Sequence, residues 1–247
     1  MDNDDKQVGE ILNRRDVLKI LGIGSAAFLA ACTSGLSETP TAASTETTTT
    51  SGSLPACVVR PELTEGPYFV DEMLNRSDIR LDPSDGSVSE GAQLNLKFNV
   101  SQVRSDGCTP LSGAQVDVWH CDASGIYSDA RDPGFDTTGK KFLRGYQVTD
   151  ANGAAQFVTI YPGWYDGRAV HIHFKVRLEG YEFTSQLFFD DAFTDEVYTQ
   201  QPYAQKGERT LRNEGDNIYQ NGGSQLMLNV SPGADDYTAT FDIGLQI

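Results

Sequence analysis

Short stretches in which apolar and polar residues alternate recur along the chain from Leu94 onward. Alternation is typical of strands with one buried face, because successive side chains of a strand point to opposite faces. The pattern predicts strands over Leu94–Val103, Ala114–Trp119, Phe142–Thr149, Ala155–Tyr161, a segment around His171 and His173, Glu182–Phe189, Gln225–Val230 and Tyr237–Ile243. Helical periodicity is nearly absent. We therefore expect an all-β fold, a two-sheet β-sandwich with long loops.

The stretch from Asp190 to Gly223 is polar and longer than an ordinary connection between strands. We expect it to pack over one end of the sheets, with a helical turn at Asp195–Tyr198.

The N-terminal region has the pattern of an export signal. Arg14 and Arg15 precede an apolar run from Ile20 to Ala31, which is short for a membrane span and suits the core of a signal peptide. The arginine pair resembles a twin-arginine signal. Leu29–Cys32 resembles a lipobox, whose cysteine becomes lipidated; the alternative is an ordinary signal peptide with a chance cysteine. We expect residues 1–32 to be a twin-arginine signal peptide with a lipobox, lipidated at Cys32.

Residues 33–54 are rich in Thr, Ser, Ala and Gly and predict a flexible, disordered tether. The folded domain is then expected over residues 55–247. The chain would be exported and anchored by its lipid at the cell membrane, facing the periplasm or exterior. In that oxidising compartment we expect one disulfide among Cys57, Cys108 and Cys121 and one remaining thiol, with the pairing open.

The chain is strongly acidic, with a net charge of −16 and a pI of about 4.4. Phosphate backbones need a basic surface, so this balance excludes nucleic acid as a partner. We expect contact with a membrane only through the lipid anchor.

Candidate chemistry gathers between Tyr161 and Val176. His171 and His173 are one residue apart, so in a strand they share a face and can bind one metal ion. Tyr165 and Arg168 lie just upstream, after a Pro-Gly turn. Taken alone, a His-x-His pair is more often two polar residues on a solvated face. The neighbouring Tyr and Arg favour a site.

Tyr127 completes a set of donors with Tyr165, His171 and His173. Zinc sites usually take Cys, His and carboxylate, whereas a phenolate is a hard anionic donor that suits Fe(III). Two phenolates and two neutral imidazoles leave one positive charge on Fe(III), which a bound hydroxide neutralises. A zinc hydrolase using the His pair and Asp166 is a poorer fit, because it needs a third ligand and a base.

The chain resembles the intradiol ring-cleavage dioxygenases, in particular their exported branch. The matching segments are TEGPYFVDEMLNRSDIR, SGAQVDVWHCDASGIYS, FLRGYQVTDANGAAQFVTIYPGWYDGRAVHIHFKV and SQLFFDD, which extend from Thr64 to Asp191. The spacing Tyr-x-x-Arg-x-x-His-x-His is specific to the family, and GIYS supplies the other tyrosine. Beyond Asp191 the similarity is looser.

The resemblance implies a non-haem Fe(III) ion held by Tyr127, Tyr165, His171 and His173. It implies cleavage of a catechol-type aromatic by O2 between its two hydroxylated carbons, giving a cis,cis-muconate-type diacid. The catalytic residues would be Tyr165, Arg168 and Gln186: Tyr165 also accepts a catechol proton, and the other two stabilise charge on the ring. The substrate-binding residues would be Pro67, Tyr68 and Arg168.

The remaining residues have simpler interpretations. We expect His120, which has no partner at ligand spacing, to be structural, Tyr146 and Tyr161 to be packed, and Trp119 and Trp164 to lie in the core and a pocket wall. The principal alternative function is a non-catalytic cell-surface β-sandwich binding module. The sequence leaves open which catechol is the substrate and whether the chain is a monomer or a dimer.

Overall fold

The computed structural model describes residues 58–247, and the predicted signal peptide, Cys32, the tether and Cys57 lie outside them. The strands are β1 (Gln93–Arg104), β2 (Gly107–Pro110), β3 (Gln115–Trp119), β4 (Arg131–Asp132), β5 (Phe135–Asp136), β6 (Arg144–Val148), β7 (Ala154–Ile160), β8 (His171–Leu178), β9 (Tyr181–Phe188), β10 (Val230–Pro232) and β11 (Tyr237–Leu245). The helices are α2 (Asp191–Val197) and α3 (Asn217–Gln220), and the short 3-10 turns are η1 (Tyr203–Lys206), η2 (Asn213–Gly215) and η3 (Gly223–Gln225). No helix among these residues is long and apolar enough to cross a membrane.

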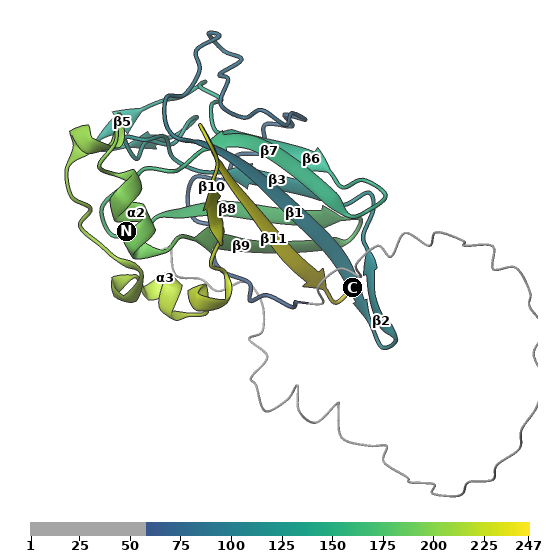
Figure 1. Ribbon diagram of the computed structural model, residues 1–247. Helices are drawn as coiled ribbons and strands as arrows, with labels where there is room; N and C mark the ends of the chain where they lie inside the picture. The colour runs from purple at the N-terminus through teal and green to yellow at the C-terminus, as the bar shows by residue number, and fades with distance from the viewer. Residues whose placement is uncertain (1–57) are drawn as a thin grey trace, which may run out of the picture. The chain divides into compact units, whose positions relative to one another are not determined.

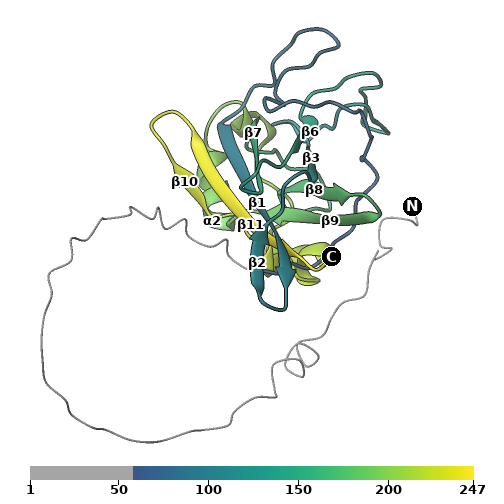
Figure 2. The same ribbon diagram turned by 90° about the vertical axis from the view of Figure 1, so that its right-hand side faces the viewer.

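Two large sheets form the sandwich (Figures 1 and 2), and β4 and β5 form a separate 2-stranded sheet. The first is a 5-stranded sheet in the order β10-β11-β1-β2, with β7 paired to β1 as well. Its central pair, β1 and β11, is parallel and sets Phe98 opposite Phe241. The second is a 4-stranded antiparallel sheet in the order β6-β3-β8-β9. The predicted two-sheet sandwich is therefore confirmed.

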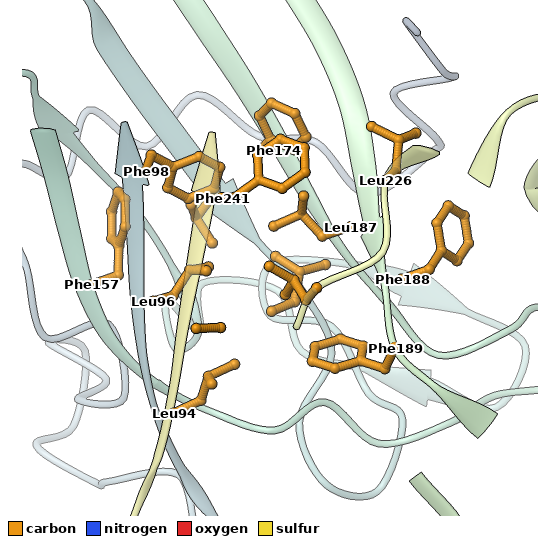
Figure 3. Close-up of a cluster of buried hydrophobic side chains, with 14 of the residues drawn as sticks. Leu94, Leu96, Phe98, Phe157, Phe174, Leu187, Phe188, Phe189, Leu226 and Phe241 are labelled. Atoms are coloured by element: carbon orange, nitrogen blue, oxygen red, sulfur yellow. The ribbon is translucent and has the colours of Figure 1, made fainter. Parts of the chain in front are cut away.

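The core lies between the sheets (Figure 3). The ring of Phe98 on β1 lies 5.3 Å from that of Phe174 on β8, and Phe174 lies 5.5 Å from Phe241 on β11. All three side chains are buried. Because side chains alternate along a strand, Ile172, Phe174 and Val176 of β8 face this core, and the intervening residues face away from it.

The outer face of the second sheet carries the predicted ligands His171 and His173. It is covered by the segment from Leu63 to Arg76. Phe69 of that segment packs at 4.8 Å from the Trp119 ring, and the backbone N–H of Arg76 donates to the Tyr146 carbonyl. The histidines are thus buried although they point away from the sandwich core.

The strand predictions agree with the structure for most of the chain, and one is wrong. Gln225–Val230 was expected to be a strand, but Gln225 ends η3 and strand pairing begins only at Val230. Leu226 and Leu228 are buried as the alternation requires. The Leu226 carbonyl and the Leu228 N–H pair with Phe188, at the end of β9, whereas the Leu226 N–H donates to the Gly223 carbonyl within the preceding turn, so no ladder continues along them. The alternation of apolar and polar residues over 225–230 therefore predicts the buried side chains correctly but wrongly predicts that the segment pairs as a strand.

The long polar segment 190–223 packs over one end of the sheets, as expected, and contains α2, η1, η2 and α3 (Figure 1). Helix α2 begins earlier than the predicted turn because the Asp190 carboxylate accepts a hydrogen bond from the Phe193 N–H. Tyr198 and Tyr203 anchor the segment: their hydroxyls donate to the carbonyls of Pro162 and Tyr161 at 2.8 and 2.7 Å.

Cys108 is disulfide-bonded, and Cys121 is a free, buried thiol. The structure therefore excludes Cys121 from the predicted disulfide.

Two glycines allow the loops that carry Tyr127 and Tyr165 to touch through their backbones. A Cβ on Gly125, whose φ is +82°, would lie 2.1 Å from the Trp164 carbonyl oxygen. A Cβ on Gly163 would lie 2.4 Å from the Ala123 oxygen. From η1, the Lys206 ammonium donates to the carbonyls of Ser124 and Trp164, one in each loop. It also lies 4.5 Å from the centre of the Trp164 ring. These contacts fix the spacing of the two tyrosine loops.

We expect Gly125→Ala to destabilise the domain more than a substitution that adds only backbone strain. Gly113 is the matched control: its φ is +83° and nothing lies within 4 Å of an added Cβ. Both variants lose about 1 kcal/mol to the left-handed backbone. Gly125→Ala should lose a further 1–3 kcal/mol, roughly the cost of an overpacked site. Urea unfolding measures both, and equal losses would contradict the close packing of the loops.

Candidate metal centre

The structure brings the four predicted ligands together around one point. His171 and His173 lie on β8, Tyr127 follows the turn after β3, and Tyr165 lies in the loop before β8. The His171 Nε2 atom is 3.0 Å from His173 Nε2, 3.2 Å from Tyr165 Oη and 3.4 Å from Tyr127 Oη. Two oxygen and two nitrogen donors thus converge from three segments of the chain.

These separations suit ligands of a single ion. Ligand atoms about 2.1 Å from a first-row metal and about 90–110° apart are separated by about 3.0–3.4 Å. The three distances from His171 Nε2 fall in that interval. Within residues 58–247 no group of three or more His, Cys, Asp and Glu side chains is placed to hold a metal. A donor set built on tyrosine therefore fits the site, and the zinc-hydrolase alternative is disfavoured.

The histidine rings present unprotonated nitrogens to the site. His171 Nδ1 lies 2.6 Å from the Ala169 carbonyl. A carbonyl only accepts, so Nδ1 carries the proton and Nε2 has a free lone pair. The His173 ring stacks on Trp119 with centroids 5.0 Å apart, and Gly66 leaves room for it, since an added Cβ would lie 3.1 Å from His173 Cε1.

Burial, with a contribution from the Arg168 guanidinium, holds the pKa of both imidazoles well below its ordinary value. Both rings are therefore neutral at physiological pH, the form that binds metals. The buried His173 Nδ1 has no hydrogen-bond partner among the described residues, which leaves Nε2 as the interacting atom of that ring.

The two tyrosines differ in their exposure. Tyr127 is 1% exposed, whereas Tyr165 is partly open to solvent. Burial raises the pKa of Tyr165 to about 12 and that of Tyr127 well above its ordinary value. Both phenols are therefore protonated when no cation is bound. They become anionic ligands only when a bound cation offsets the cost of burying the charge.

Arg168 and Gln186 lie beside the four predicted ligands. The Arg168 NH1 group lies 3.4 Å from His171 Nε2, and NH2 donates to the Gln186 side-chain oxygen. The amide nitrogen of Gln186 in turn donates to the Thr64 carbonyl at 2.8 Å. The guanidinium is thus directed at the point where the ligands meet.

Asp216 is a site residue that the sequence analysis missed. Its carboxylate accepts from Arg168 Nε at 3.0 Å and from the Ala169 N–H at 2.8 Å. It lies in the polar segment 190–223, where similarity to the family is loose and no motif marks it. From the sequence, an aspartate just before α3 predicts only an N-cap of that helix.

Of the two predicted pocket residues, Tyr68 contacts one of the predicted ligands. Its ring stacks on Tyr127 with centroids 4.4 Å apart, and its hydroxyl donates to Asp132 on β4 at 2.9 Å. Pro67 is exposed at the bend before it.

His120 and Tyr161 are structural, as expected, and Asp166 lies on the surface. The His120 Nδ1–H donates to the Cys121 carbonyl, and Nε2 accepts from the Thr159 hydroxyl at 2.7 Å, so this ring has no free nitrogen. The Asp166 side chain is exposed and accepts from Thr210. Tyr161 is fully buried against Phe189.

Comparison with known proteins agrees with this geometry. The sequence model of the dioxygenase family matches residues 64–246. An intradiol ring-cleavage dioxygenase from Tetranychus urticae has a similar structure, with a TM-score of 0.68 and 32% identity over 77% of this chain and 95% of that one. Chlorocatechol 1,2-dioxygenase from Pseudomonas putida is 34% identical over 107 residues, which are 36% of this chain and 40% of that enzyme. Catechol 1,2-dioxygenase from Candida albicans is 32% identical over 137 residues, 47% of this chain and 42% of that enzyme.

The chain thus spans about two fifths of the length of these curated relatives. The family match covers most of the described domain, and the similar structure is covered almost completely. From its sequence, its sandwich and its convergent tyrosines and histidines, this chain belongs to the intradiol ring-cleavage dioxygenase family.

Proposed function

We propose that this protein is a non-haem Fe(III)-dependent dioxygenase of aromatic compound catabolism. It cleaves the ring of a catechol-type substrate between its two hydroxylated carbons with O2 and yields a cis,cis-muconate-type diacid. The observation that carries the proposal is the convergence of Tyr127 Oη, Tyr165 Oη and His173 Nε2 within 3.4 Å of His171 Nε2. A non-catalytic binding module has no need for these four donors at one point.

Two phenolates and two neutral imidazoles form a hard donor set of charge −2, which suits Fe(III) better than a softer divalent ion. When bound, Fe(III) supplies a charge that keeps the phenolates ionised and draws electron density from a coordinated catecholate, which makes the ring reactive toward O2. Because both histidines are neutral, all of the negative charge of this donor set comes from the two phenolates.

Tyr165 is the better placed of the two tyrosines to accept a catechol proton. A catechol must lose two protons to bind through both oxygens. A tyrosine phenolate of the donor set could accept one of these protons at its Oη atom. Tyr165 is partly exposed whereas Tyr127 is 1% exposed, so Tyr165 has room to move. Burial raises the pKa of its phenol, so a Tyr165 phenolate that is no longer held by a cation would take up a proton at Oη.

Arg168 provides a fixed hydrogen-bond donor beside the ligands, and Gln186 helps to hold it in place. The guanidinium is held between Gln186 and Asp216, so it need not reorient as negative charge develops on the ring. Tyr68, stacked on Tyr127, together with Pro67 lines the substrate side of the site in this proposal.

We also propose that the protein is exported and held at the membrane by a lipid on Cys32, where it attacks aromatics outside the cytoplasm. This rests on the twin-arginine and lipobox patterns of residues 1–32. Full-length protein should sediment with membranes, and Cys32→Ser should move most of it to the soluble fraction. Unchanged sedimentation of Cys32→Ser would contradict the lipid anchor.

The iron site can be tested by visible spectroscopy. The purified domain should show a broad tyrosinate-to-Fe(III) charge-transfer band, which shifts to longer wavelength with anaerobic catechol, and should then release a muconate when O2 is admitted. Tyr165→Phe should change the band and lower kcat by roughly 100-fold or more, because a ligand and a base are lost together. Tyr181→Phe, on β9, is the control and should match the parent. An iron-loaded but colourless domain would contradict the proposal.

The ionisation of the tyrosines can be tested without redox chemistry. Burial raises the pKa of both phenols, so the metal-free domain should show no phenolate absorbance from them at neutral pH. Loading with Ga(III), which carries the same charge as Fe(III), should produce an ultraviolet difference band from two phenolates. The band should fall to about half in Tyr165→Phe and stay whole in Tyr181→Phe. No band on loading would show that the phenols are not ligands.

A further inference from the structure

Asp216 makes contacts that join the catalytic site to the segment 190–223. One carboxylate oxygen accepts from Arg168 Nε at 3.0 Å and from the Ala169 backbone N–H at 2.8 Å. The other accepts from the N–H groups of Ile218 and Tyr219 at 2.7 and 3.3 Å and so caps α3. The side chain of Asp216 is 1% exposed and that of Arg168 is 14% exposed. A buried carboxylate with all these donors is strongly held in place.

The contacts account for the orientation of the Arg168 guanidinium. Nε is held by Asp216 and NH2 by the Gln186 oxygen, while NH1 lies 3.4 Å from His171 Nε2. Two of its three nitrogens are therefore used for orientation and the third faces the ligands. Gln186 is itself fixed through the Thr64 carbonyl.

The same ion pair cancels the charge of Arg168. A free guanidinium beside the metal ligands would attract any carboxylate on a substrate ring. With a buried carboxylate 3.0 Å away, the pair is close to neutral as seen from the site. Lys206 and Arg144, two other cations near the site, are held by neutral acceptors: Lys206 by the carbonyls of Ser124 and Trp164, and Arg144 by Ser128 and the Tyr68 carbonyl.

We propose that Asp216 is the positioning residue of this site: it holds Arg168 with NH1 toward the ring and neutralises it, so that the enzyme prefers catechols without a ring carboxylate. This rests on the function proposed above, with Arg168 beside the substrate. The substrate class is then an uncharged or hydroxylated catechol rather than a carboxylated one.

The test uses Asp216→Asn in the iron-loaded domain. Asn caps helices as well as Asp, so α3 keeps its cap. The variant removes the negative charge at position 216. If the Asn oxygen caps α3, its NH2 group faces the Arg168 Nε–H and the Ala169 N–H, so Arg168 loses its hydrogen-bond acceptor. Asp190→Asn is the matched control, because Asp190 caps α2 through the Phe193 N–H and is exposed. Ser is also a good N-cap residue, so Asp216→Ser replaces Asp216→Asn in the test if the Asn variant does not fold.

Two probes are compared, catechol and 3,4-dihydroxybenzoate. Anaerobic titration of the charge-transfer band gives their dissociation constants, and steady-state assays give kcat and KM with catechol. Asp216→Asn should keep the band of the resting enzyme and lower kcat for catechol by on the order of 10- to 100-fold, as for a misplaced catalytic group. Its affinity for 3,4-dihydroxybenzoate relative to catechol should rise about tenfold, because a single unpaired charge is exposed to the ligand. Asp190→Asn should change neither.

The outcomes separate this inference from the proposed function. If the parent domain has no charge-transfer band with iron, the proposed function fails before Asp216 is tested. If the parent has the band and turns over catechol, but Asp216→Asn binds both probes in the parent's ratio, the charge role of Asp216 is wrong. An unchanged kcat would overturn the positioning role. Loss of both affinities in equal proportion would indicate general damage and would also contradict the proposal.

Discussion

The structure of the site depends on bringing four donor atoms close together in a place with little water. His171 Nε2 lies within 3.4 Å of a second imidazole nitrogen and two phenol oxygens. Burial lowers the pKa of the imidazoles and raises that of the phenols, so without a cation all four groups are neutral. A bound trivalent ion favours the ionised form of the phenols and leaves the imidazoles neutral. The neutral forms of the histidines and of the tyrosines thus follow from one property, the low polarity of their surroundings.

The two faces of strand β8 have different roles in the sandwich. Ile172, Phe174 and Val176 pack into the core between the sheets, which makes the strand rigid, while His171 and His173 point to the outer face. The segment from Leu63 to Arg76 then buries that face. The site therefore rests on a packed strand and takes its other ligands from loops, an arrangement that combines precision with access.

Much of this was predictable from the chain. Strand alternation located most of the sheet elements, and the spacing of Tyr165, Arg168, His171 and His173 identified the ligand-bearing segment because β geometry is local. Two features were not predictable. Gln225–Val230 alternates because Leu226 and Leu228 are buried, yet no neighbouring strand extends alongside. Asp216 acts across 48 residues from Arg168, and a single aspartate in a polar segment carries no periodicity to mark it.

A crystal structure of the iron-loaded domain, with diffraction measured on both sides of the iron absorption edge, would show whether Tyr127, Tyr165, His171 and His173 hold one iron ion. We expect one anomalous peak with both tyrosine oxygens and both Nε2 atoms within about 2.3 Å of it. A peak elsewhere, or a peak at the histidines with both tyrosines turned away, would contradict this expectation.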